Sequence, residues 1–299
     1  MRVLGVGYCT LDFIGEVDRF AEPDAKVEWD KLSVQGGGAA ATAMVTLARW
    51  GVDTLFVGKV GADARGGEIV ATLSGEGIDV DGVVYQDGAI SQVTFVVIES
   101  ATGQKRTYFT VGTVDPLTED EVGAQMLEGV DVLHVDGTSS SAQLKLVKLA
   151  RERGILTVLD AERVEDGVIE LVGASDIVVA SERFASQFTG QGSLEGMCKA
   201  LVERGPGVVV VTMGDEGAVA MEKDGVLVRA PAYPVEVVDN TGAGDVFHGA
   251  FIYAYTMKRE LSECLSFACV AAGISCLGLG GRERIPELAE VDAILAAGW

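Results

Sequence analysis

From residue 118 onward, short apolar runs alternate regularly with segments of helical character. Helices are predicted at 118–128, 141–153 and 165–172, followed in turn by strands at 130–135, 155–159 and 177–179. Because neighbouring parallel strands need a long crossover, usually a helix, this alternation predicts a doubly wound, mainly parallel sheet flanked by helices. The chain has 299 residues, 48% of them hydrophobic, which is enough for one large α/β core. We therefore expect a single domain over residues 1–299.

A second, smaller sheet is predicted from segments that do not fit the β/α alternation. Strands of the main sheet are expected at 3–6, 54–57, 207–212 and 226–229, while paired β-like segments fall at 14–18 with 27–34 and at 94–98 with 106–111. The turn at 100–103 joins the last pair. The small sheet thus takes its strands from about 13–34 and 90–113.

The turn Gly242-Ala243-Gly244-Asp245 is the most informative stretch for chemistry. The apolar spacing after it predicts a helix that begins at the glycines. The first N–H groups of a helix have no partner within it, so they can hold a phosphate without a basic side chain. Asp245 would then stand in the first turn as a general base, although an aspartate also favours a helix N-terminus for structural reasons alone.

The longer run from Asp239 to Asp245, followed by Gly249, resembles the C-terminal signature of the PfkB, or ribokinase-like, family of carbohydrate kinases. The glycines at 36–38 before an alanine-rich helix resemble the family's N-terminal signature, and the likeness extends over nearly the whole chain. It implies a ribokinase-like fold in which the small sheet is a lid over the substrate. It also implies ATP-dependent phosphorylation of a sugar or nucleoside hydroxyl.

The resemblance assigns roles to individual residues. It makes Asp245 the catalytic base and the N–H groups of residues 242–245 an anion hole, which gives Gly242, Ala243 and Gly244 a catalytic role beside Asp245. The ATP-binding residues it implies are Thr212, Gly214, Gly217, Gly242, Gly244 and Ala272. The substrate-binding residues it implies are Asp12, Gly36, Gly37, Gly38, Thr42 and Arg106, with Lys26, Lys31 and Tyr108 as further candidates on the lid.

The expected cofactors are ATP and Mg²⁺, with K⁺ as a third candidate. Many relatives place magnesium with an NxxE motif, but this chain has Ser181 and Phe184 at the matching positions. Because a phenylalanine has no oxygen ligand, we expect a neighbour such as Glu182, water or the phosphates to hold the metal. Asp239 and Thr241, with the loop at 278–286, correspond to a monovalent-cation site of the family.

The substrate class is less constrained than the reaction. Many relatives have asparagine where this chain has Ala41, and the segments at 36–43 and 280–286 look closer to the sulfofructose kinase branch. No arginine lies at 136–140, where that branch binds the sulfonate. We expect a ketohexose-like sugar, with 6-deoxy-6-sulfofructose as one candidate and a pentose or nucleoside as alternatives.

Three other classes of protein fit the sequence less well. A non-catalytic sensor of sugars or nucleotides would not need Asp245 as a base. A Rossmann dehydrogenase would need GxGxxG after the first strand, and a P-loop protein would need GxxxxGK[ST]; the chain has neither motif at the relevant turn.

The formal charge of −22 argues against nucleic acid or an anionic membrane as a partner. The expected partners are the sugar, ATP and a second copy of the chain bound through the lid. Five cysteines without a CxxC pair, and an amino terminus unlike a signal peptide, indicate a cytoplasmic location. His134 and His248 look isolated, and no function is assigned to them.

Overall fold

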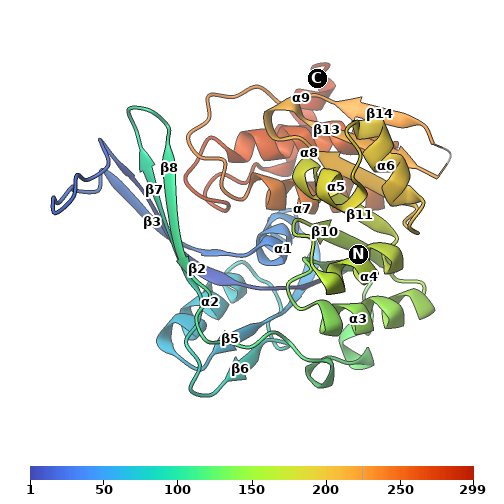
Figure 1. Cartoon of the computed structure of the whole chain (residues 1–299), viewed down its shortest axis with the longest axis horizontal. Helices are drawn as coiled ribbons and strands as arrows, with labels where there is room; N and C mark the ends of the chain where they lie inside the picture. Colours follow the sequence, from blue (N-terminus) through green and yellow to red (C-terminus); the bar gives the residue numbers. More distant parts are fainter. Residues whose placement is uncertain (224) are drawn as a thin grey trace.

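The computed structural model describes residues 1–223 and 225–299. Its large sheet has eight strands in the order β14-β13-β12-β11-β10-β9-β1-β4 (Figure 1). The strands are β1 (Arg2–Val6), β4 (Asp53–Val57), β9 (Val132–Val135), β10 (Leu156–Ala161), β11 (Ile177–Ser181), β12 (Val208–Thr212), β13 (Ala218–Glu222) and β14 (Leu227–Ala230). The six strands from β4 to β12 are parallel, and β13 and β14 are antiparallel additions at one edge. The predicted mainly parallel sheet is confirmed.

Helices cover both faces of this sheet, so its strands are buried on both sides. One core contains residues of α1 (Ala39–Arg49), α7 (Ala243–Thr256) and α8 (Leu261–Ser275), joined by α2 (Ala64–Ser74) and α9 (Leu288–Ala296). The other contains residues of α3 (Ser140–Glu152), α4 (Asp166–Ala174), α5 (Glu182–Thr189) and α6 (Leu194–Val202). None of the helices in the described part is long and apolar enough to cross a bilayer.

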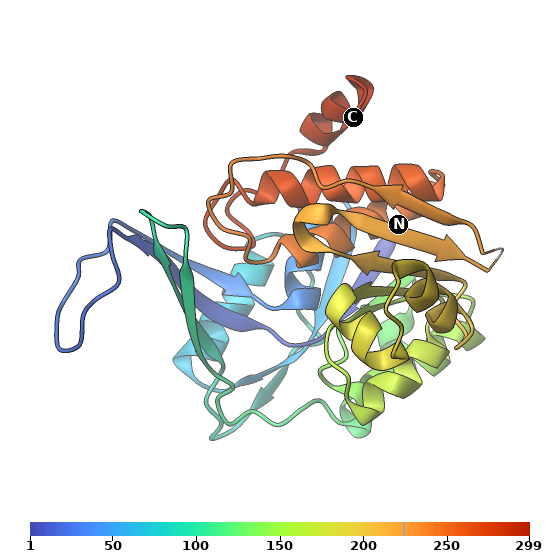
Figure 2. The same ribbon diagram turned by 45° about the horizontal axis from the view of Figure 1, so that its top comes forward.

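The small sheet stands apart from the large one at the side of the molecule (Figures 1 and 2). Its order is β3-β2-β7-β8, from β2 (Thr10–Val17), β3 (Lys31–Gly37), β7 (Val93–Glu99) and β8 (Lys105–Thr110). A third sheet pairs β5 (Lys59–Gly61) with β6 (Val84–Gln86). The predicted small sheet is therefore present.

One predicted helix is wrong. Residues 118–128 form two short 3₁₀ helices, Glu119–Glu121 and Ala124–Leu127, instead of one α-helix. Between them Val122 and Gly123 are extended, and Val122 is buried. Packing of Val122 into the core interrupts the helical hydrogen-bond ladder, which overrides the local propensity of the segment.

Candidate functional site

The start of α7 lies at the carboxyl edge of the large sheet. Gly242 precedes the helix with φ of 75°, a left-handed conformation that glycine adopts without strain. A Cβ on Gly242 would overlap with the Cα of Gly281, so two backbones meet here without side chains between them. The N–H of Ala243 donates to the carbonyl of Asn240. That leaves the N–H groups of Gly244 and Asp245 without helical partners, fewer than the sequence predicted, to face a bound anion.

Asp245 is half-buried in the first turn of α7. Desolvation, followed by the charge of Asp160, raises its pKa to about 8, while His248 and Arg282 act in the opposite direction. A carboxyl group with a pKa near neutrality is suited to exchange a proton with a substrate hydroxyl.

His134 and His248 are not isolated, contrary to the prediction from sequence. Their rings lie 5.5 Å apart, and His248 Nε2 is 3.3 Å from Asp160 Oδ1. Burial alone would lower the pKa of His248, but the charges of Asp160 and Asp245 outweigh it and raise the pKa. Burial, followed by the charge of His248, lowers the pKa of His134 to about 4. The structure therefore places a histidine–carboxylate pair, His248 with Asp160, next to Asp245.

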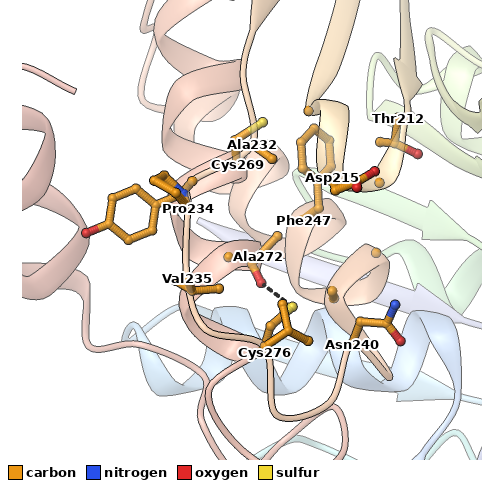
Figure 3. A pocket seen from close by; sticks show the side chains of 17 residues that line it. Thr212, Asp215, Ala232, Pro234, Val235, Asn240, Phe247, Cys269, Ala272 and Cys276 are labelled. Carbon is orange, nitrogen blue, oxygen red and sulfur yellow. Dashed lines mark hydrogen bonds between the residues drawn. The ribbon is translucent and has the colours of Figure 1, made fainter. Parts of the chain in front are cut away.

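A cavity of about 450 Å³ opens between the start of α7, helix α8 and the turn after β12 (Figure 3). Five residues predicted to bind ATP line it, namely Thr212, Gly214, Gly217, Gly244 and Ala272. Gly242 is not part of the lining but begins the helix that closes one end of it. Tyr233, Phe247, Cys269 and Cys276 add apolar walls that the sequence analysis did not identify. A narrow cavity with apolar walls and a helix N-terminus suits a flat ring joined to phosphates.

Asp12 is within strand β2, not in the turn before it as expected, and its side chain is largely buried. Its Oδ1 atom has no hydrogen-bond partner among the described residues. Burial raises its pKa to about 6, against the opposing effects of the Thr94 hydroxyl and the Arg282 charge. A Cβ on Gly37 would overlap with the Asp12 carboxylate, which explains the glycine at that position. A buried acceptor without a partner is costly unless a ligand supplies the donor.

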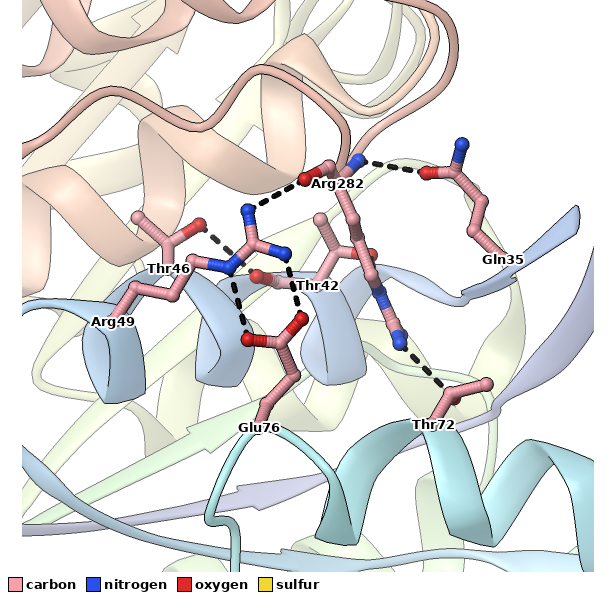
Figure 4. Close-up of polar contacts among 7 residues, drawn as sticks. All are labelled: Gln35, Thr42, Thr46, Arg49, Thr72, Glu76 and Arg282. Atoms are coloured by element: carbon pink, nitrogen blue, oxygen red, sulfur yellow. Dashed lines mark hydrogen bonds and ion pairs between the residues drawn. The ribbon is translucent and has the colours of Figure 1, made fainter. Parts of the chain in front are cut away.

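Arg282 is buried beside Asp12 and was not predicted as a site residue. Its guanidinium donates to the Thr42 hydroxyl, the Thr72 hydroxyl and the Gly37 carbonyl, and its backbone N–H donates to Gln35 (Figure 4). Thr42 therefore binds Arg282 in this structure. Ala41 is fully buried in the core of the large sheet. Arg282 thus links the loop after α8, by hydrogen bonds, to the segment Gly36–Gly38 at the end of strand β3.

The predicted lid residues do not all come to the site. Along paired strands, side chains of Asp12, Thr94 and Lys105 share one face, while Arg106 and Tyr108 lie on the opposite face. Arg106 lies over the Phe20 ring, 4.0 Å from its centroid. Lys31 pairs with Glu16 at an exposed end of the sheet, and Lys26 is in the loop before β3. The structure therefore gives no support to Arg106 as a substrate contact.

The described residues form no cluster of three or more His, Cys, Asp or Glu that could hold a metal by itself. At the NxxE positions, the Ser181 hydroxyl caps α5 by accepting the N–H of Phe184, and Phe184 is fully buried. Glu162 is exposed, and its charge acts on Asp245. Glu162 is therefore an exposed carboxylate whose charge reaches the start of α7, and a carboxylate is the kind of group that Mg²⁺ accepts as a ligand.

The predicted monovalent-cation site is occupied by a side chain. Asp239 Oδ1 accepts the N–H and hydroxyl of Thr241, and Asp239 Oδ2 accepts the N–H of Gly280. The Lys105 ammonium, from strand β8, donates to Asn240 Oδ1 at 2.5 Å and Thr241 Oγ1 at 3.2 Å. Lys105 had no sequence signal of its own, since only the strand register shows which face it is on.

Comparison with known proteins agrees with this geometry. The family model described as pfkB family carbohydrate kinase matches residues 2–288. A nucleoside kinase of Methanothermobacter thermautotrophicus is 28% identical, covering 99% of this chain and 96% of that protein. The ketohexokinase of Mus musculus is 27% identical over 95% of this chain and 98% of its own length.

A solved structure supports the fold in the same way. A presumed ribokinase II from E. coli, in complex with ATP and Mg²⁺, superposes with a TM-score of 0.86 at 21% identity. The superposition covers 99% of each chain. At this level of identity the likeness shows that the two chains share a fold.

Proposed function

The chain belongs to the pfkB family of carbohydrate kinases, and we propose that it transfers the γ-phosphoryl group of ATP to a hydroxyl of a ketohexose-like sugar. That it is a kinase of sugars or nucleosides follows from its family and relatives. The observation that carries the proposal is the position of Asp245, whose pKa is raised, at the helix start that closes one end of the cavity.

In the proposed mechanism, Asp245 takes the proton of the attacking hydroxyl. Phosphoryl transfer depends mainly on alignment and on stabilising charge at the transferred group. The N–H groups of Gly244 and Asp245 supply fixed donors for that charge at the start of α7. Gly244 has open space around its Cα, so nothing in the protein blocks the approach of a phosphate.

The nucleotide is proposed to lie in the cavity of Figure 3, with its base along α8 beside Ala272. Magnesium, when bound with ATP, neutralises phosphate charge. Glu162 would hold it, because this carboxylate is exposed and Phe184 offers no oxygen. The family comparison with an ATP and Mg²⁺ complex supports this cofactor pair.

Asp12 is proposed to bind sugar hydroxyls. Its unpartnered Oδ1 needs a donor, and a hydroxyl group supplies one. Gly36, Gly37 and Gly38 would form the wall next to it, held by Arg282. Arg282 acts electrostatically on both Asp12 and Asp245, which fits a sugar that spans the two carboxyl groups.

The substrate class is tested by measuring ADP release with ketoses, aldoses, sulfosugars, phosphosugars and nucleosides. We expect the highest kcat/KM for a ketohexose or for 6-deoxy-6-sulfofructose. A preference for ribose or a nucleoside would overturn the ketohexose assignment and favour the alternatives. Ligand binding without ADP release from any compound would instead indicate a sensor.

We propose that the small sheet is a lid and that its outer face mediates a homodimer. Leu32, Val34, Phe95 and Tyr108 lie on the face away from Asp12 and are 44–59% exposed. An apolar sheet face of this kind is typical of an interaction surface. Sedimentation should show a dimer for the wild type and a monomer for Phe95→Lys; a wild-type monomer would refute the proposal.

A further inference from the structure

The Lys105 side chain extends from the small sheet to the run from Asp239 to Asp245, which is called the signature turn below. It extends from the first residue of β8, on the same face of the small sheet as Asp12. Its Nζ atom contacts oxygens of three consecutive residues, because besides Asn240 and Thr241 it lies 3.7 Å from Asp239 Oδ1. These residues come immediately before Gly242 and the start of α7.

Asp239 needs a positive partner at this position. Its side chain is only 1% exposed, and a buried carboxylate is costly unless it is paired and hydrogen-bonded. Three backbone or hydroxyl groups donate to it, and none of them carries a charge. Among the described residues, Lys105 is the only basic group within ion-pair distance of Asp239.

A free potassium ion does not fit beside this ammonium. An ion held by Asp239 and Thr241 would need the same oxygens to which Lys105 already donates. Two positive charges on one carboxylate would repel each other at short distance. The residues of the predicted monovalent-cation site therefore favour an ammonium group that is already part of the chain.

We infer that the ammonium of Lys105 takes the place of a monovalent cation in the signature turn, so that closure of the lid completes the nucleotide site. The inference rests on the proposed function in one respect, namely that phosphates bind at the start of α7. Asn240 links Lys105 to the start of α7. Its side-chain oxygen accepts a hydrogen bond from Lys105, and its backbone carbonyl accepts the N–H of Ala243. Lys105 is thus a positioning residue for the turn.

The negative charge of the molecule gives the Lys105 ammonium a second effect, on the binding of phosphates. The formal charge is −22, and no lysine or arginine lines the described nucleotide cavity. A triphosphate entering this cavity would meet Asp215 in its lining. The ammonium of Lys105 neutralises Asp239, so this carboxylate no longer repels phosphates that bind at the start of α7.

The test compares wild type, Lys105→Met and Lys105→Arg in buffers of KCl, NH₄Cl or tetramethylammonium chloride at equal ionic strength. Lys148→Met is the matched control, because Lys148 is an exposed lysine of helix α3, outside the small sheet and the lining of the nucleotide cavity. Two readouts need no sugar: the melting temperature, and calorimetric affinity for a non-hydrolysable ATP analogue with Mg²⁺. A third is kcat and KM for ATP with the best substrate.

We expect wild type, Lys105→Arg and Lys148→Met to behave alike in all three salts. Lys105→Met should bind the ATP analogue about tenfold more weakly in tetramethylammonium, the loss of one charge-assisted contact. K⁺ or NH₄⁺ should restore part of that affinity and raise the melting temperature of this variant alone.

Two results would overturn the inference. One is a wild type whose ATP-analogue affinity and melting temperature rise with K⁺, since the site would then accept a free cation. The other is a Lys105→Met variant that matches the wild type in every salt. If Lys105→Met does not fold, the potassium titration of the wild type still decides. A wrong substrate assignment would change only kcat and KM, the third readout. Failure of the inference about Lys105 can therefore be told apart from failure of the proposed function.

Discussion

His248 Nε2 lies 3.3 Å from Asp160 Oδ1, and this buried pair joins helix α7 to the carboxyl end of strand β10. The contact connects two residues that the sequence gives no reason to pair. Burial would raise the pKa of Asp160, but the charge and hydrogen bond of His248, with the charge of His134, together outweigh it and lower the pKa. The pKa shifts of both groups favour the ionised pair, and each partner depends on the other.

Removing both partners should cost less stability than the sum of the two single removals. His248→Ala leaves the Asp160 carboxylate buried and unpaired, so the free energy of unfolding should fall by about 3–5 kcal/mol. The double variant Asp160→Ala/His248→Ala should be more stable than the sum of the single effects predicts, by about 1–3 kcal/mol. Urea unfolding of the four proteins measures this coupling, and additive effects would mean that the two side chains do not interact.

Asp245 should control both the rate and its pH dependence. Asp245→Asn keeps the shape and removes the base, so kcat should fall by roughly 10²–10⁴ with little change in ATP affinity. In the wild type, kcat/KM should rise with pH, reach half of its plateau near pH 8 and level off only above that, because the pKa of the base is about 8. Activity of Asp245→Asn within a few-fold of wild type would exclude the catalytic role.

The same pKa makes a prediction about stability. The folded-state pKa of Asp245 is above its ordinary value of 3.8, so the wild type loses stability as pH rises between 3.8 and about 8. Asp245→Asn lacks this group, and its melting temperature should therefore exceed that of wild type increasingly from pH 5 to pH 8. Parallel curves for the two proteins would show that the pKa is not raised.

Two glycines of the signature turn should respond differently to substitution. A Cβ on Gly242 would overlap with the Gly281 backbone, at a φ that other residues adopt poorly, so Gly242→Ala should lower the melting temperature. A Cβ on Gly244 meets open space in the cavity. Gly244→Val should therefore fold normally and lose ATP binding. Unchanged ATP turnover in a folded Gly244→Val would mean that the phosphates bind elsewhere.

Asp12 separates the sugar half of the site from the nucleotide half. Asp12→Ala should weaken sugar binding by about 1.5–3 kcal/mol for each charge-assisted hydrogen bond lost, with little change for ATP. Calorimetric titration with each ligand measures the two effects. Equal losses for both ligands would show that Asp12 supports the fold, and no loss for either would move the sugar site away from β2.

Much of the fold could be predicted because its signals are local. The alternation of apolar strands and helices specified the parallel sheet, and the glycines at 242–244 specified where α7 begins. Five residues predicted to bind ATP line one cavity, since turns after parallel strands meet at one edge of the sheet. The same local signals failed at 118–128, where burial of Val122 broke a predicted helix.

The sequence by itself determined the fold class and the helix start at Gly242, and it singled out Asp245 as the candidate base. Only the tertiary structure decided which distant charges meet. Lys105 and Asn240 are 135 positions apart, and strand register selects the face from which Lys105 reaches the turn. Arg282 beside Asp12, and His248 beside Asp160, are likewise products of packing. Sequence periodicity fixes the face of an element that is buried, whereas contacts between elements depend on how the whole chain closes around its core.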